Sequence, residues 1–112
     1  METLADRRRR FREQMNRREA MIVPGAGNAL TARVIADRQF EAVYVTGAGI
    51  ANTHLGTPDI GLVTLTELAV TVSTIAEICQ LPLVVDIDTG FGNAINTRRT
   101  VRLIERAGGF AC

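Results

Sequence analysis

The sequence lacks most of the residues that build several common kinds of functional site. It contains no lysine and no tryptophan, and it has two cysteines and one histidine in 112 residues. Cys79 and Cys112 are too few for a disulfide framework, and Cys79 lies in an apolar helical pattern, where we expect a buried, inert thiol. Without a cluster of Cys and His, or a Ser–His–Asp spacing, neither a zinc site nor a hydrolytic triad is indicated, and His54 is expected to be solvated.

Long hydrophobic runs are also missing. No stretch approaches the roughly 20 apolar residues of a membrane span, and no apolar signal core follows the Arg-rich start. The sequence is 46% hydrophobic and 22% charged, as in one ordinary globular domain. We therefore expect residues 1–112 to form a single domain of a cytoplasmic protein without a membrane partner.

The charge is nearly balanced, with a net value of +1. So weak a field does not imply a nucleic-acid partner. The arginines are nevertheless uneven, because seven of the thirteen lie within residues 7–18. We interpret this run as the solvated face of a helix, and the alternative of a nucleic-acid-binding arm predicts salt-dependent binding to DNA.

The first half of the chain alternates helical and strand-like patterns. Residues 3–16 have no Gly or Pro and predict a helix, and residues 20–23 form a short apolar run that predicts a buried strand closed by a turn at Pro24-Gly25. A second helix, capped by Asn28, should present Leu30, Val34 and Ile35 on its apolar face up to about Arg38. Residues 42–45 then predict another buried strand.

The second half of the chain again alternates helical and strand-like patterns, after a long segment that fits neither. Residues 46–63, with four glycines and a proline, are predicted to be a functional loop. Thr64 or Thr66 should cap a helix that continues to Cys79, and residues 83–85 predict a third strand that ends at Asp86. A last helix is expected over residues 94–106, stopping at Gly108-Gly109.

This alternation predicts an α/β fold with parallel strands, right-handed crossovers and helices on both faces of the sheet. Periodicity alone does not separate an open sheet from a closed barrel. The dinucleotide-binding fingerprint is absent, since residues 25–27 and 47–49 lack the third glycine at the required offset.

The third strand leads directly into two carboxylates, Asp86 and Asp88, followed by Gly90 and Gly92. In an extended backbone, side chains two residues apart point to the same face, which at the carboxyl end of a parallel strand is where α/β proteins bind ligands. Two close anions need a cation, a shared proton or hydration, and Mg²⁺ with its oxygen ligands suits them. The alternative is that these aspartates only cap the next helix or hold the Gly-rich turn.

A second group of candidate residues follows the second strand. Thr46, Gly47 and Ala48 could expose backbone N–H groups as an anion-binding nest, or form an ordinary turn. Asp59, which follows Pro58, could equally be a turn-forming residue. Tyr44 faces either the core or the site.

Read in order, three motifs resemble the isocitrate lyase/phosphoenolpyruvate mutase superfamily, which includes methylisocitrate lyase, carboxyphosphonoenolpyruvate mutase and oxaloacetate decarboxylase-like enzymes. The resemblance extends from about Leu4 to Gly108. The motifs occupy residues 44–49 (Tyr-Val-Thr-Gly-Ala-Gly), 55–61 (Leu-Gly-Thr-Pro-Asp-Ile-Gly) and 85–92 (Val-Asp-Ile-Asp-Thr-Gly-Phe-Gly).

This resemblance implies the N-terminal part of a (β/α)₈ barrel, with about three parallel strands and an incomplete barrel. It implies that Asp86 and Asp88 hold Mg²⁺, that Thr46, Gly47 and Ala48 bind a substrate carboxylate, and that Tyr44 and Asp59 act in catalysis. The implied reaction forms or breaks a C–C or C–P bond of a 2-oxo or 2-hydroxy acid through a pyruvate-type enolate. The intact parent is expected to be a homo-oligomer.

The sequence also departs from the family pattern. A barrel of this type needs about 250 residues, and the Cys-containing catalytic loop and metal-binding Glu of the C–C lyases are absent. We interpret residues 108–112 as replacing the expected fourth strand, and we expect a truncated chain that is inactive alone and aggregation-prone at its open sheet edges. The alternative is a small non-catalytic α/β module that binds a phosphate or carboxylate.

Overall fold

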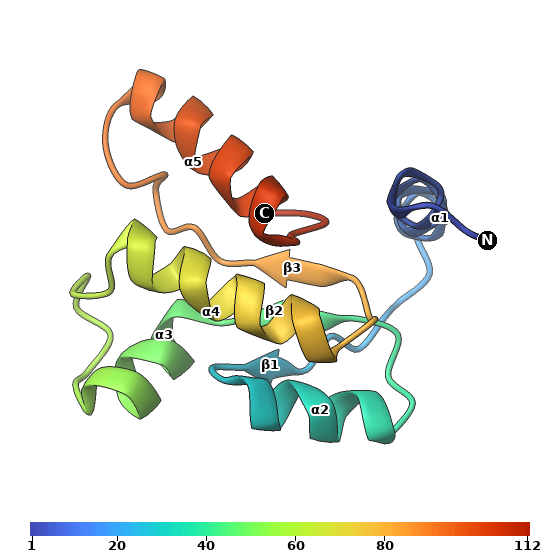
Figure 1. Cartoon of the computed structure of the whole chain (residues 1–112), viewed down its shortest axis with the longest axis horizontal. Coiled ribbons are helices and arrows are strands. Elements are labelled where there is room, and N and C mark those ends of the chain that lie inside the picture. Colours follow the sequence, from blue (N-terminus) through green and yellow to red (C-terminus); the bar gives the residue numbers. More distant parts are fainter.

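A computed structural model describes residues 1–112 and contains a three-stranded parallel sheet (Figure 1). The strands are β1 (Gly25–Ala26), β2 (Val43–Val45) and β3 (Leu83–Val85), in the spatial order β1-β2-β3. Gly25 pairs with Tyr44, and Tyr44 pairs with Val84. The predicted α/β class with three parallel strands is confirmed.

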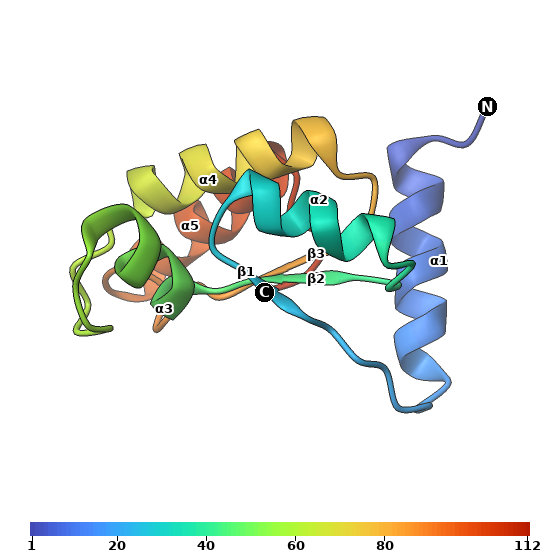
Figure 2. The ribbon, with the colours of Figure 1, turned by 90° about the horizontal axis from the view of Figure 1, so that it is seen from below.

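Three helices cover one face of this sheet, namely α2 (Ala29–Asp37), α4 (Leu65–Ile78) and α5 (Ala94–Ala107) (Figure 2). The core between them and the sheet includes Val43, Val45, Leu83 and Val85 from the strands. No helix lies on the opposite face, which carries the half-buried alternate residues. The prediction that helices cover both faces was therefore wrong for this chain, and the one-sided layering is that of a barrel wall.

The helix boundaries follow from capping residues, as predicted. Thr64 caps α4 in a reciprocal capping box with Glu67, so that Thr64 and not Thr66 is the N-cap of the helix. Asn28 caps α2, and α5 ends at Gly108, whose φ of 118° suits only glycine. No helix is long and apolar enough to cross a membrane.

The predicted apolar face of α2 was partly wrong. Ala32 and Ile35 are the buried residues of this helix, whereas Leu30 and Val34 are 74% and 50% exposed. The helix therefore faces the sheet with Ala32 and Ile35, and Leu30 and Val34 lie on its outer side. The predicted burial of Cys79, at the end of α4, is confirmed.

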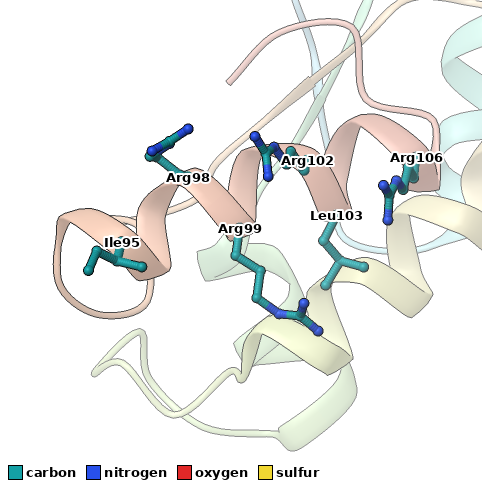
Figure 3. Close-up of a pocket in the computed structure, with 6 residues that line it drawn as sticks. All are labelled: Ile95, Arg98, Arg99, Arg102, Leu103 and Arg106. Atoms are coloured by element: carbon teal, nitrogen blue, oxygen red, sulfur yellow. The ribbon is translucent and has the colours of Figure 1, made fainter.

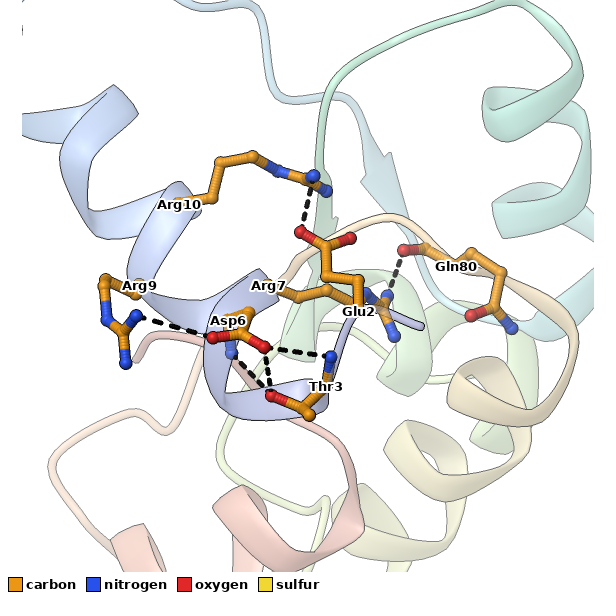
Figure 4. A network of polar contacts seen from close by, with 7 residues as sticks. All are labelled: Glu2, Thr3, Asp6, Arg7, Arg9, Arg10 and Gln80. Atoms are coloured by element: carbon orange, nitrogen blue, oxygen red, sulfur yellow. Dashed lines mark hydrogen bonds and ion pairs between the residues drawn. The ribbon is translucent and has the colours of Figure 1, made fainter.

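Helix α1 (Leu4–Asn16) stands across the N-terminal ends of the strands (Figure 2). Its buried residue is Phe11, whose ring meets the edge of Phe110 at a centroid distance of 6.2 Å. Arg7 donates a hydrogen bond to the carbonyl oxygen of Gln80, just before β3 (Figure 4). The predicted N-terminal helix is thus confirmed, and it closes one end of the sheet.

Two predicted elements were wrong in their extent. Residues 20–23 form no strand, and Ile22 is 75% exposed, because this run precedes the point where β2 begins to pair. The first ladder bond runs from the Tyr44 N–H to the Pro24 carbonyl. The predicted loop at 46–63 begins instead with a helical turn, α3 (Gly47–Ile50), and a π-helix, η1 (Ala51–Leu55).

The C-terminal residues lie beside β3, on the side away from β2. Ala111 forms a parallel bridge with Val84, and the Val85 N–H donates to the Ala111 carbonyl at 2.8 Å. The Phe110 N–H donates to the Leu83 carbonyl, also at 2.8 Å. The interpretation that residues 108–112 replace a fourth strand was wrong, because they make the first hydrogen bonds of one.

Candidate active site

The polar residues singled out in the sequence converge at the C-terminal ends of β2 and β3 (Figure 1). Tyr44 and Val84 pair on the face of the sheet that no helix covers. Thr46 and Asp86 follow two residues later, and the Asp86 N–H continues the ladder by donating to the Val45 carbonyl at 3.0 Å. Because side chains alternate along a strand, Thr46 and Asp86 emerge on the same open face as Tyr44.

Asp86 and Asp88 both approach the backbone of Gly47. A methyl group added at Gly47 would lie 3.2 Å from Asp86 Oδ2 and 4.0 Å from Asp88 Oδ1. The Gly47 N–H donates weakly to Asp86 Oδ2 at 3.4 Å. The two carboxylates therefore border one small space, which a side chain at position 47 would fill.

The reason for their proximity differs from the strand alternation assumed from the sequence. Asp88 has a φ of 49°, so the backbone is no longer extended there, and its N–H donates to Asp86 Oδ1 at 3.0 Å. A turn, and not a continued strand, brings the second carboxylate back toward the first. Asp86 thus also holds the Gly-rich turn, whereas the cap of α5 is Asn93 and neither aspartate.

The surroundings of Asp88 change its acidity. The pKa of Asp88 is raised by partial burial of its carboxyl group and then by the negative charges of Asp86 and Asp59. As a residue, Asp88 remains exposed to solvent. Asp59 is also exposed, and its charge contributes to the raised pKa of Asp88.

The negative charges of Asp86 and Asp88 also affect the phenol group of Tyr44. Burial raises the pKa of its phenol, and Asp86 and Asp88 raise it further. The hydroxyl group therefore stays protonated at neutral pH and can donate a hydrogen bond.

The predicted anion-binding nest at residues 46–48 is the first turn of α3. Thr46 caps this turn by accepting a hydrogen bond from the Gly49 N–H at 3.2 Å, and the Thr46 carbonyl accepts from the Ile50 N–H. Gly47 and Ala48 are its first two residues, beside Asp86. His54 lies on the π-helix and is exposed, as expected for a solvated histidine.

The comparison with known proteins identifies the family. The model of the phosphoenolpyruvate phosphomutase family matches residues 11–112. The chain belongs to this family. It is 46% identical over 99 residues to 2,3-dimethylmalate lyase of Eubacterium barkeri, covering 88% of this chain and 34% of that protein. It is also 46% identical over 101 residues to 2-methylisocitrate lyase of Aeropyrum pernix, covering 90% and 32%.

Solved structures of the phosphomutase and isocitrate lyase group have the same arrangement of elements. The crystal structure of 2,3-dimethylmalate lyase matches with a TM-score of 0.84 at 32% identity, over 93% of this chain and 37% of that one. Phosphonopyruvate hydrolase in complex with oxalate and Mg²⁺ matches with a TM-score of 0.86 at 26% identity, over 92% and 36%. The chain thus spans about a third of the length of the relatives that it matches, and its fold corresponds to the N-terminal part of such lyases.

The residues of this family member fit a divalent cation that prefers oxygen. Asp86 and Asp88 supply carboxylate oxygens around the space above Gly47, and no sulfur or imidazole ligand lies among the predicted site residues. No group of three or more His, Cys, Asp or Glu side chains is close enough to form a complete cage. This donor set matches Mg²⁺, which keeps several waters and needs only one or two carboxylates.

Three surface hollows lie away from the carboxylates. One, of about 400 Å³, lies along the outer side of α5 beside Arg98, Arg102 and Arg106 (Figure 3). The second lies between α1 and α5, and the third lies beside Gln80. None of the three is lined by Asp86 or Asp88.

Proposed function

We propose that this chain carries the metal-binding part of an Mg²⁺-dependent lyase or mutase. The substrate would be a 2-oxo or 2-hydroxy carboxylic acid, in which a C–C or C–P bond is formed or broken through a pyruvate-type enolate. The names of the relatives support this class, since both are lyases of branched hydroxy acids. The observation that carries the proposal is the placement of Asp86 and Asp88 around the space above Gly47, at the carboxyl ends of parallel strands.

Asp86 and Asp88 would hold the metal ion in this proposal. Their charges repel, and the raised pKa of Asp88 is one consequence of that repulsion. A bound divalent cation would relieve this repulsion. When bound, Mg²⁺ supplies the positive charge that stabilises an enolate oxygen. Water can reach the pair from the open face of the sheet, in keeping with an ion that retains part of its hydration shell.

The substrate would lie beside the metal-binding pair. Gly47 leaves room next to Asp86, and its N–H points toward that carboxylate. In this proposal Thr46, Gly47 and Ala48 would bind a carboxylate of the substrate. Tyr44, protonated at neutral pH, would donate a hydrogen bond to a developing negative charge. Asp59 would act as a further polar group at the entrance, on the side of Asp88.

Binding of Mg²⁺ to the chain tests the metal site directly. We expect thermal unfolding to shift upward with Mg²⁺, by about 2.7 kcal/mol of stabilisation at a free concentration of 100 times Kd. Asp86→Asn should abolish this shift. Asp37→Asn, at the end of α2 and at the other end of the sheet, removes one carboxylate as a matched control and should leave the shift intact.

Oxalate, a planar dicarboxylate that resembles the enolate of pyruvate, tests the substrate side. Calorimetric titration should show oxalate binding in the presence of Mg²⁺ and none in its absence. A wild-type chain that Mg²⁺ does not stabilise, or an Asp86→Asn variant that Mg²⁺ stabilises equally, would refute the metal site. Oxalate binding that does not depend on Mg²⁺ would instead favour a non-catalytic anion-binding module.

A further inference from the structure

Thr100 differs from every other buried residue of the molecule. It is the only polar residue in the buried set, and its side chain has no solvent exposure. It lies on α5, near the middle of that helix. A buried hydroxyl group is costly unless it is hydrogen-bonded, so its partner is informative.

The hydroxyl of Thr100 bonds outside its own helix. It donates to the carbonyl of Gly90 at 2.8 Å, across ten residues of sequence. Three other helical threonines behave differently, since the hydroxyls of Thr71, Thr74 and Thr97 each donate to the carbonyl four residues earlier. Thr100 therefore ties α5 to the segment between β3 and α5, which carries Asp86 and Asp88.

That segment packs tightly against the first two turns of α5. A Cβ atom at Gly90 would overlap the side chain of Thr97, and one at Gly92 would overlap Asn96. Both glycines have positive φ angles, of 96° and 146°. These close contacts leave the turn little room to move toward α5. The hydrogen bond from Thr100 opposes movement of the turn away from the helix.

The turn needs such support because Asp88 has an uncommon backbone conformation. Its φ of 49° is positive, and so is that of Phe91, at 58°. The other two non-glycine residues with positive φ, Arg18 and Gln39, lie just after helix ends, where this conformation is routine. Within the turn, the Asp88 N–H bonds to Asp86, the Gly90 N–H bonds to the Ile87 carbonyl, and the Gly90 carbonyl bonds to Thr100.

We propose that Thr100 is a positioning residue for the carboxylate pair: its buried hydroxyl group fixes the turn at Gly90 and thereby sets the position of Asp88 relative to Asp86. The inference rests on the proposed function for the identity of the ligand. A residue that served only to fill the core would be served better by valine, which has the same shape and no hydroxyl group to satisfy. The hydroxyl group instead contributes through its hydrogen bond to the Gly90 carbonyl in the turn.

Three variants of the full chain test this role. Thr100→Val keeps the shape and removes the hydrogen bond, and Thr100→Ser restores the hydroxyl group. Thr71→Val is the matched control, because it removes a threonine hydroxyl bond that stays within its own helix, α4. Mg²⁺ affinity is measured by calorimetry. Thr100→Val should raise Kd by about tenfold, the lower end of the range for residues that support metal ligands. Thr100→Ser should bring Kd back close to the wild-type value, and Thr71→Val should not change it.

Hydrogen exchange in the metal-free chain gives a second readout. The Asp88 and Gly90 N–H groups should exchange faster in Thr100→Val than in the wild type, while amides in the centre of α4 keep their protection. Wild-type protection of both amides in a folded Thr100→Val variant would overturn the proposal. A folded Thr100→Ser variant that loses Mg²⁺ affinity or amide protection would also overturn it, by assigning the effect to packing.

The two proposals fail in different ways. A wild-type chain that binds no Mg²⁺ refutes the proposed metal site, whereas the exchange of Asp88 and Gly90 still decides whether Thr100 positions the turn. Strong Mg²⁺ binding that Thr100→Val leaves unchanged refutes only the role of Thr100.

Discussion

The two ends of the sheet differ in what the chain places there. At the N-terminal ends of the strands, α1 covers the sheet and buries Phe11 against Phe110. At the C-terminal ends, the chain places carboxylates that repel each other and a turn with two non-glycine residues of positive φ. Packing at the N-terminal end stabilises the fold, whereas the charge repulsion and the positive φ angles at the C-terminal end destabilise it. In barrel enzymes this division separates stability from catalysis.

Cationic side chains reinforce the stabilising end. The guanidinium groups of Arg7 and Arg8 lie 5.3 and 5.7 Å from the centre of the Phe110 ring. Arg8 also donates to the carbonyls of Glu105 and Gly109, at 2.8 and 3.1 Å. The Arg-rich start of the chain, interpreted from the sequence as a solvated face, therefore has in part a packing role. Its other ion pairs, such as Arg10 with Glu2, are exposed and contribute little (Figure 4).

The largest expected change in the free energy of unfolding is at the N-terminal end of the sheet. Phe11→Ala should lower the free energy of unfolding by about 3 kcal/mol, since it empties a buried site against Phe110. Urea unfolding measures this change. If the two ends are separate in function, the folded variant should keep the Mg²⁺ affinity of the wild type. A tenfold loss of affinity at unchanged fold would show that α1 also shapes the proposed metal site.

A smaller effect is expected at the start of α1. Thr3→Ala removes the capping hydroxyl that accepts from the Asp6 N–H, and should cost about 1 kcal/mol. It should also raise the pKa of Asp6, which is lowered mainly by its hydrogen bond with the Thr3 side chain. A lowered carboxyl pKa stabilises the fold above the ordinary value, and this stabilisation is lost as the pH falls through the lowered pKa. Thr3→Ser is the control, and an unchanged pKa of Asp6 in Thr3→Ala, measured by NMR titration, would contradict the assignment.

The smallest effect is expected at the C-terminal end and has the opposite sign. Asp88→Asn should stabilise the metal-free chain at neutral pH, by less than about 1 kcal/mol because the group is exposed. The folded pKa of Asp88 is raised above 3.8, so the folded state holds its proton more tightly than the unfolded state. The contribution of Asp88 to the stability of the wild type therefore falls as the pH rises through the window above 3.8.

The gain from Asp88→Asn should accordingly vanish below that window and reach its full size above it. Urea unfolding over a range of pH measures the difference between the wild type and the variant. A gain that does not change with pH would contradict the role of charge repulsion. The same variant should lose Mg²⁺-dependent stabilisation, so that stability and metal binding change in opposite directions at this end of the sheet.

Sequence reasoning located most elements but not all of their contacts. The cap at Thr64, the stop at Gly108 and the strand before Asp86 depend on local patterns, and the structure has each of them. The strand expected at residues 20–23 and the buried face at Leu30 and Val34 depended on hydrophobicity alone, and the structure differs there. Hydrophobicity predicts that a residue can be buried, but a neighbour must be present to bury it.

The candidate site shows the same limit. The sequence indicated Asp86, Asp88 and the residues after the second strand, whose roles remain predictions. It gave no reason to single out Thr100, because a threonine in a helix ordinarily bonds to its own backbone. The pair Asn93 and Asn96, which caps α5, has the spacing of a capping box and could have been recognised from the sequence.

The sequence by itself determined the alternation of strands and helices, the parallel α/β class and the family, since these depend on periodicity, caps and motifs within short stretches of chain. Only the tertiary structure decided which face of the sheet stays open, that α1 closes its N-terminal end, and that a turn brings Asp88 back beside Asp86. These features depend on contacts between residues far apart in sequence, such as Phe11 with Phe110 and Gly47 with Asp86. Local preference cannot specify such contacts, because their free energy arises only when the separate segments pack together.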